Sequence, residues 1–370
     1  MHVGLVIYGD LEETSGGFRY DRKLVSYLQS RGDTVDVISL PWRRYPRAVL
    51  DGFSPRVRSK IDRNVDVLLV DGLCHPSVWR HNDRLQGPDA IVGLVHHLRS
   101  DDPTERFRHI IRPFERRFLE SVDGLVCTSE FSATRVDRIA PRLSSVPRVV
   151  AHPAGRVEGK ACSEQDVSDR ARVEPFRIVF VGNLIPRKDP ETVVSALDRF
   201  CSSRPAVTVR LTVVGSQDAD PSYAASVESH ARNLNLDDRV TFTGQTSDEE
   251  LASILARSHV CCVLSRYEAF GMVHLEAMEY GVVPIASTVG GATEFVVDGE
   301  NGFLVDPGDF EAIADRLVRL ESDRNLLAEL ATGALETAAE WPEWTETMET
   351  VRTVLRQFVD GQPRVRGVPP

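Results

Sequence analysis

The sequence has few cysteines, no long apolar run and no signal peptide pattern. Its 370 residues include only six cysteines, and no two of them have the C-x-x-C spacing typical of a metal site. We therefore expect six reduced thiols and no disulfide framework. No apolar run approaches the roughly 20 residues of a membrane-spanning helix, and Met1 leads directly into a strand pattern without a signal peptide. These absences predict a cytoplasmic protein.

Basic residues are fewer than acidic ones. The chain has 44 Lys and Arg against 55 Asp and Glu, a net charge of -11, which argues against general nucleic-acid binding. With 42% hydrophobic and 27% charged residues, the composition is that of a globular protein. A chain of 370 residues is too long for one ordinary core, so two domains are expected.

Residues 42–63 reverse this charge balance. They hold seven basic and two acidic residues, a net of 7 − 2 = +5. Two interpretations are open. The first is a solvated face, the usual origin of such a run. The second is peripheral docking at the inner face of an anionic membrane, or on a polyprenyl-phosphate acceptor.

Apolar runs of strand length alternate with helical patterns in both halves of the chain. Such near-continuous hydrophobicity in short runs, with helices between them, predicts an α/β protein with two doubly wound parallel sheets. The first domain is expected at 1–155, a charged linker at 156–175, the second domain at 176–340, one more helix at 341–359 and a disordered tail at 360–370.

The pattern of residues 260–302 indicates a ligand-binding site. A strand, a polar turn with Glu268, a helix carrying Glu276, a second strand and a glycine turn follow one another there. Ligands gather at the carboxyl ends of parallel strands, and helix N–H groups suit a phosphate that Gly271 allows close to the backbone. A carboxylate among apolar neighbours, such as Glu276, needs a partner, and a ribose diol is one. The stretch predicts a nucleotide or sugar-phosphate site.

A second strand–turn–helix passage begins at 176–181 and places Lys188 just before a helix. An ammonium at that point is suited to a diphosphate.

The first domain offers weaker signals. Gly16-Gly17 lies between the first strand and its helix, where it fits either a phosphate loop or a plain turn. His96 and His97 end the fourth strand, where they either face a ligand or hydrogen-bond a neighbouring loop.

The 260–302 stretch resembles the family 4 glycosyltransferases, retaining enzymes of GT-B fold. The matching residues, in family order, are Ser265, Glu268-Ala269-Phe270-Gly271, Glu276-Ala277, Gly281-Val282-Val283-Pro284, Gly290-Gly291, Glu294 and Asn301-Gly302. The resemblance implies two Rossmann-like domains facing a cleft, with the donor on the second, the acceptor on the first, and helix 341–359 packing back towards the first. Asn183 stands where the family often has arginine, so more of the diphosphate charge falls on Lys188 and Arg187.

The resemblance also implies roles for single residues. His96 would touch the transferred sugar or its acceptor, Lys188 the diphosphate and Glu268 the sugar hydroxyls. The donor-binding residues it implies are Gly16, Gly17, Asn183, Arg187, Lys188, Gly244, Glu268, Phe270, Gly271, Met272, Val273 and Glu276. We expect no metal and no cofactor besides the donor, because Lys188 and helix N-termini can neutralise the diphosphate, and we interpret Asp218-Ala219-Asp220 as loop structure.

The predicted function is retaining, metal-independent transfer of a sugar from a nucleoside diphosphate sugar, in glycan biosynthesis. The acceptor would be lipid-linked, an oligosaccharide or a small molecule. The alternatives are a GT-B-like sugar-nucleotide epimerase or phosphorylase, and a non-catalytic GT-B partner subunit. Both glutamates are present, which argues against the last.

Overall fold

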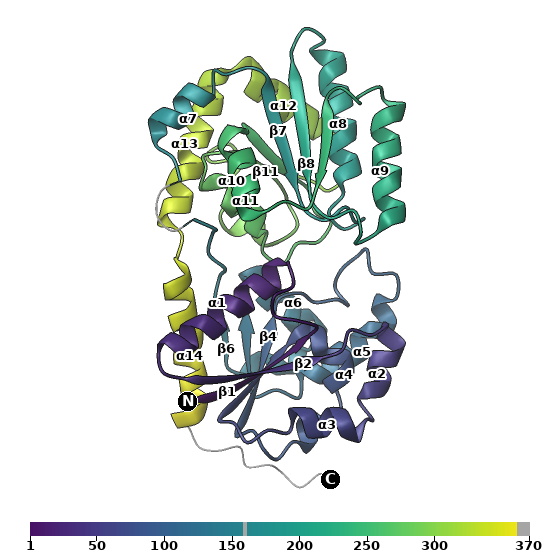
Figure 1. Ribbon diagram of the computed structural model, residues 1–370, viewed down its shortest axis with the longest axis vertical. Helices are drawn as coiled ribbons and strands as arrows, with labels where there is room; N and C mark the ends of the chain where they lie inside the picture. The colour runs from purple at the N-terminus through teal and green to yellow at the C-terminus, as the bar shows by residue number, and fades with distance from the viewer. Residues whose placement is uncertain (158–160, 361–370) are drawn as a thin grey trace. The chain divides into compact units, whose positions relative to one another are not determined.

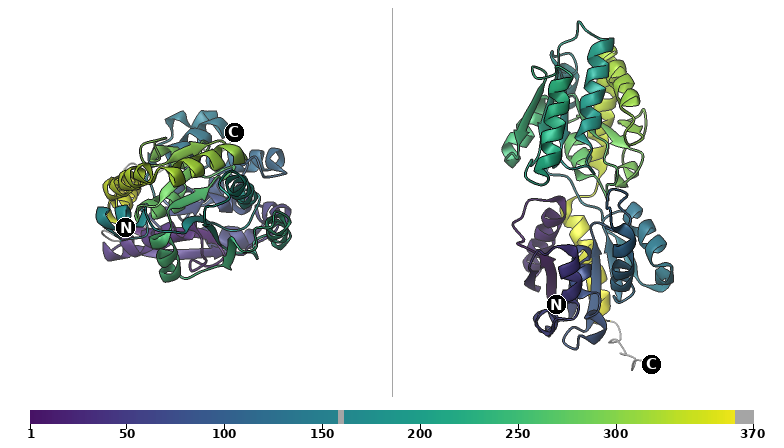
Figure 2. Two further views of the ribbon diagram at one scale, coloured as in Figure 1. Left: turned by 90° about the horizontal axis from the view of Figure 1, so that it is seen from above. Right: turned by 90° about the vertical axis from the view of Figure 1, so that its right-hand side faces the viewer.

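The computed structural model describes residues 1–157 and 161–360, including all their side chains except those of residues 144 and 145. Two compact units form the chain, Met1–Pro153 with Pro342–Pro370, and Ala154–Trp341. Each is built on one six-stranded parallel sheet with helices on both faces (Figures 1 and 2). The predicted pair of doubly wound parallel sheets is confirmed. The predicted disordered tail lies, beyond Asp360, outside the described residues.

The sheet of the first unit has the order β2-β1-β3-β4-β5-β6. Its strands are β1 (His2–Tyr8), β2 (Thr34–Leu40), β3 (Val67–Asp71), β4 (Ala90–Val95), β5 (Gly124–Cys127) and β6 (Arg148–Val150). The chain leaves β1 towards β2 and then returns to β1's other side for β3. Ligands bind at such a reversal, beyond the carboxyl ends of the strands.

Helices cover both faces of this sheet. On one face, α1 (Gly16–Ser30) and α14 (Trp344–Asp360) lie beside each other (Figure 1). The apolar stripe of α14, which includes Met348, Val351 and Leu355, is buried there with residues of α1, β3 and β4. The other face is covered by helices α3 (Pro55–Ile61), α4 (His75–Val78), α5 (Arg108–Leu119) and α6 (Glu130–Ile139).

The sheet of the second unit has the order β12-β11-β10-β7-β8-β9. Its strands are β7 (Phe176–Val181), β8 (Val209–Val214), β9 (Val240–Gly244), β10 (Val260–Val263), β11 (Val283–Ser287) and β12 (Phe303–Val305). Around it lie α8 (Pro190–Ser203), α9 (Pro221–Asn233), α10 (Asp248–Arg257), α11 (Met272–Met278), α12 (Phe310–Ser322) and α13 (Arg324–Glu340). Because β7 and β10 are neighbours, the loops that follow them lie side by side.

The predicted linker at 156–175 is wrong in one respect. It contains a helix, α7 (Glu164–Arg170), which begins with a capping box of Ser163 and Asp166. Val167, only 1% exposed, packs in the core of the second unit. The helix is short and mostly polar, so the sequence shows no periodic apolar pattern that would predict it.

No helix in the described ranges is both long and apolar enough to span a membrane.

Candidate active site

The carboxyl ends of β7 and β10 bring Lys188 and Glu268 together. Lys188 precedes α8 and Glu268 lies in the turn before α11, 80 residues apart in the chain. The Lys188 ammonium donates a hydrogen bond to Glu268 Oε2. Ser265 Oγ donates to the same oxygen at 3.0 Å. Lys188, predicted to contact the diphosphate, and Glu268, predicted to contact the sugar hydroxyls, therefore form one group.

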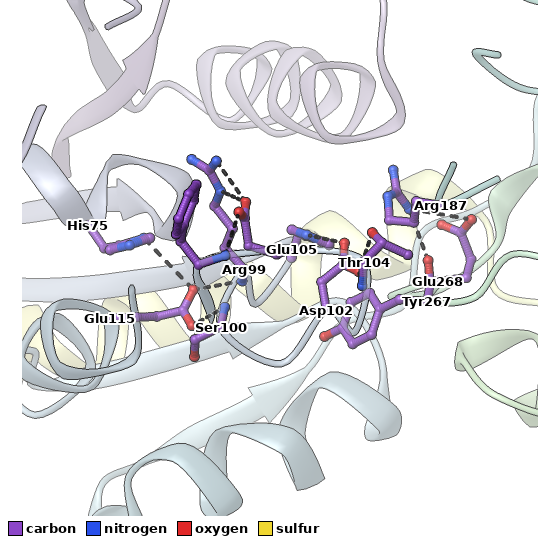
Figure 3. Close-up of polar contacts among 12 residues, drawn as sticks. His75, Arg99, Ser100, Asp102, Thr104, Glu105, Glu115, Arg187, Tyr267 and Glu268 are labelled. Carbon is purple, nitrogen blue, oxygen red and sulfur yellow. Dashed lines mark hydrogen bonds and ion pairs between the residues drawn. The ribbon is translucent and has the colours of Figure 1, made fainter. Parts of the chain in front are cut away.

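The charge of Glu268 is set by its cationic neighbours. Burial raises the pKa of this carboxyl group, but Lys188 and Arg187, together with hydrogen bonds from Lys188 and Ser265, lower it to about 2. Arg187 Nη1 lies 3.9 Å from Glu268 Oε2 (Figure 3). The Glu268 side chain is 17% exposed. An ionised, partly exposed carboxylate can accept hydrogen bonds from sugar hydroxyls, whereas it cannot serve as a proton donor at neutral pH.

Backbone contacts hold the two loops in this arrangement. Arg266 N donates to Arg187 O at 2.8 Å. Arg187 Nη1 donates to Tyr267 O at 3.0 Å (Figure 3). Arg266 Nε also donates to Asp189 Oδ2 at 3.0 Å. These contacts fix the loops that carry Lys188 and Glu268 relative to each other.

The start of α11 follows directly. Gly271 has φ of +95°, a left-handed conformation that favours glycine, and it is the N-cap of α11. Phe270, predicted to bind the donor, has its ring buried 5.2 Å from that of Phe295 and 5.8 Å from that of Trp341. Its side chain is therefore part of the core, and only its backbone could reach a donor.

Glu276 lies inside α11 and is 5% exposed. Arg156 Nη2 lies 3.2 Å from both of its carboxylate oxygens. The sequence correctly indicated that a carboxylate in this setting needs a partner, but it missed Arg156, because the residue falls in the stretch interpreted as a linker.

The first unit holds a separate polar group around His96. His96 Nε2 lies 2.9 Å from Asp21 Oδ1 on α1, with side-chain exposures of 9% and 1%. Burial lowers the pKa of His96, but Asp21 and Asp71 outweigh burial and raise it above its ordinary value. For Asp71, burial raises the pKa to about 6, although His96 opposes the shift. His96 thus lies near two acidic side chains that favour its protonated form.

Gly17 belongs to the same group. A Cβ added to it would lie 3.5 Å from the His96 ring, so α1 approaches His96 closely at this glycine. Gly16 and Gly17 are the first two residues of α1, with Ser15 as its N-cap, and not part of the preceding loop as predicted. The sequence analysis missed Asp21. Its spacing of three and seven residues from Leu24 and Leu28 places it on the buried face of α1, where a charged residue is unusual.

The loop after β4 is also held by buried polar contacts. Glu115, 1% exposed, accepts the backbone N–H groups of Arg99 at 2.8 Å and Ser100 at 2.9 Å (Figure 3). His97 Nε2 lies 3.6 Å from Asp102 Oδ2 in this loop. His97 therefore lies beside a carboxylate of its own loop, whereas His96 contacts Asp21 on α1.

The remaining predicted residues are spread over the second unit. Asn183 is exposed after β7, and Gly244 ends β9 with φ of +71°. Met272 and Val273 are half-buried in the first turn of α11. Lys188, Arg187 and Glu268 form one group in the second unit, and His96 and Gly17 form another in the first. The donor-binding and catalytic roles of all these residues remain predictions.

Comparison with known proteins agrees with this architecture. Over 96% of its length the chain superposes on sucrose-phosphate synthase from Thermosynechococcus elongatus with a TM-score of 0.79, 22% identity and 98% of that chain covered. It superposes on Anabaena HepE in complex with UDP-glucose with a TM-score of 0.74 and 18% identity, over 96% of this chain and 100% of that one. The two units are therefore those of the GT-B fold.

The sequence places the chain more narrowly. Residues 163–337 match the family model of glycosyl transferases group 1. The chain is 31% identical over 254 residues to the D-inositol 3-phosphate glycosyltransferase of Stackebrandtia nassauensis, an alignment covering 66% of this chain and 56% of that protein. The chain spans about half the length of the curated relatives it matches. Residues 163–337 are thus similar to the glycosyl transferases group 1 family, in agreement with the resemblance of the motifs at 260–302.

Proposed function

We propose that the chain is a retaining, metal-independent glycosyltransferase that uses a nucleoside diphosphate sugar. The observation that carries the proposal is the group of Lys188, Arg187 and ionised Glu268 at adjacent strand ends of a glycosyl transferases group 1 domain. Cations at this position can neutralise a diphosphate, and a carboxylate beside them can hold the hydroxyls of the attached sugar.

The chemical demand on the site is to stabilise a leaving diphosphate. Lys188 and Arg187 supply positive charge, and N–H groups near Gly271 and Met272 supply donors, which are worth most where water is excluded. Glu268 would orient the sugar and Glu276 the ribose. Neither acts as a covalent nucleophile in this proposal: the acceptor attacks on the face that the diphosphate leaves, within an ion pair. His96 would act on the sugar or acceptor from the first unit.

The compared proteins suggest which substrates to test first. UDP-glucose is the ligand of the Anabaena structure, so uridine nucleotide sugars are the first donors to try. The Stackebrandtia relative is named for D-inositol 3-phosphate, a small acceptor rich in hydroxyls. Lipid-linked and oligosaccharide acceptors follow from the family resemblance.

A donor screen followed by transfer assays tests this function. One of the UDP-, GDP- or ADP-sugars is expected to raise the Tm by about 5 °C at a hundredfold excess over its Kd. Incubation with that donor and an acceptor should give a glycoside with the anomeric configuration of the donor, read by NMR.

Three other results would contradict the proposal. Inversion at the anomeric carbon would exclude a retaining enzyme. Isomerisation or phosphorolysis of the donor without transfer would favour the epimerase or phosphorylase alternative. A folded chain that binds none of these nucleotides would favour a non-catalytic subunit.

We also propose that residues 42–63 contact an anionic membrane surface. In this stretch, which includes α2 (Tyr45–Asp51) and α3, the exposed apolar side chains are Trp42 at 52%, Leu50 at 66% and Phe53 at 56%. The exposed basic residues are Arg44, Arg47, Arg56, Arg58, Lys60 and Arg63. A hollow of about 520 Å³ is lined by Pro55, Arg56, Ser59, Lys60 and Arg63. Apolar side chains among cations match the chemistry of an anionic bilayer surface.

Vesicle sedimentation tests this contact. The chain is expected to bind vesicles that contain phosphatidylglycerol and to leave pure phosphatidylcholine vesicles in solution, with binding weakened by high salt. The double variant Leu50→Ser/Phe53→Ser should bind about tenfold more weakly, whereas Val297→Ser, which removes a 47% exposed side chain of the second unit, should bind normally. Equal binding to neutral vesicles, or none to either, would exclude the contact.

A further inference from the structure

Glu276 on α11 and Glu279, the residue that caps the C-terminal end of α11, both contact the segment at the start of the second unit. Glu279 accepts the backbone N–H of Arg156 at 2.8 Å and that of Val157 at 3.1 Å. The carboxylate approaches so closely that a Cβ on Gly155 would lie 1.9 Å from Glu279 Oε1. The backbone of residues 155–157 therefore lies against the Glu279 carboxylate. These contacts fix the position from which the Arg156 side chain extends.

That side chain reaches the other glutamate. Residues 276 and 279 are three apart, so they share one face of the helix. Arg156 Nη2 lies 3.2 Å from each oxygen of Glu276, and the side chains are 18% and 6% exposed. A charge this buried is costly without a counter-charge, and Arg156 supplies one. Arg156 Nη1 contacts Asp248, which is 71% exposed, so the guanidinium is also held at its solvent side.

The salt bridge and a bound ribose are compatible. A carboxylate offers about four acceptor positions, and the contacts with Arg156 use one on each oxygen. A neutral diol could not replace the guanidinium, because it would leave the carboxylate's charge without a counter-charge inside the domain. The arrangement therefore favours a Glu276 that keeps Arg156 while it binds hydroxyls.

We propose that Arg156 is a positioning residue for ribose recognition. It balances the charge of Glu276 and fixes the direction of its carboxylate, so that the oxygens meet the ribose hydroxyls without rearrangement. The inference rests on the proposed function, because it takes Glu276 as the ribose ligand. No contact between Arg156 and the nucleotide is required.

Nucleotide binding by calorimetry tests this role, with UDP, GDP and ADP each compared with its 2′-deoxy form. For the nucleotide that binds, the wild-type chain is expected to prefer the ribose form about tenfold or more, the ratio for one charge-assisted hydrogen bond. In Arg156→Gln the preference should fall to about twofold or less. Arg156→Lys keeps the charge and should restore most of it.

Arg170→Gln is the matched control. Arg170 donates to Tyr280 O, just after α11, at 2.8 Å and to Ala256 O on α10 at 3.1 Å. It therefore stabilises the same region through backbone oxygens and not through Glu276. This variant should lower the Tm and keep the ribose preference. Since a purely structural loss weakens both nucleotide forms alike, the ratio separates positioning from stability.

An unchanged ratio in Arg156→Gln, or tighter binding of the ribose form, would overturn the inference while the proposed function stands. If the folded wild-type chain bound no nucleoside diphosphate, the proposed function would fail, and this inference with it.

Discussion

Replacing Lys188 with alanine is expected to abolish sugar transfer while both sheets stay folded. The substitution removes the ammonium that would stabilise the leaving diphosphate, and loss of one such group costs at least about 100-fold in turnover. Arg187, with its guanidinium 3.9 Å from Glu268, keeps one cation in the site, so donor binding should fall less than turnover. The measurement is kcat and KM with the donor found by the screen.

Stability against acid provides an independent readout for the same variant. The pKa of Glu268 is lowered to about 2 from its ordinary value of 4.5, so the group stabilises the fold above about pH 4.5, and this contribution is lost as the pH falls towards 2. Without Lys188 the pKa of Glu268 is less depressed, and the unfolding free energy should depend less on pH in this range. Full transfer activity in a folded Lys188→Ala chain would refute the assignment.

Replacing Glu276 with alanine is expected to abolish turnover at ordinary donor concentrations. The loss removes hydrogen bonds between a carboxylate and the ribose hydroxyls, each worth about 1.5–3 kcal/mol. It also removes the buried partner of Arg156, which then keeps only its contact with the exposed Asp248, so the fold should lose stability as well. Unlike Lys188→Ala, this variant should therefore have a lower Tm as well as no activity.

Glu276→Gln separates the two effects, since it keeps the size of the side chain and one carbonyl oxygen. It should fold better than the alanine variant and show a raised KM for the donor, measured by steady-state kinetics. Glu249→Ala, at an exposed position on α10, serves as the control and should retain wild-type rates. A Glu276→Gln enzyme with an unchanged donor KM would exclude a role of this carboxylate in ribose binding.

Local patterns in the sequence were sufficient to predict the two sheets. Apolar runs such as 176–181 and 283–287 predicted strands β7 and β11 at their observed bounds, because a buried parallel strand must be apolar along its length. Lys188, Glu268 and Gly271 were predicted as site residues because each follows a strand or precedes a helix, and the structure confirms only that placement. Helix α7 was missed because its few apolar residues gave no periodic signal.

The sequence by itself determined the two-sheet α/β class, since the apolar runs that predict its strands depend on short-range periodicity. It also carried the motifs that resemble the family 4 glycosyltransferases, since those residues lie close together in the chain. Only the tertiary structure decided the partners of the ionised groups. Lys188 and Glu268 are 80 residues apart, Asp21 and His96 are 75 apart, and Arg156 and Glu276 are 120 apart. A buried charge takes whichever opposite charge the packing of strands and helices brings within reach, and no local pattern records that choice.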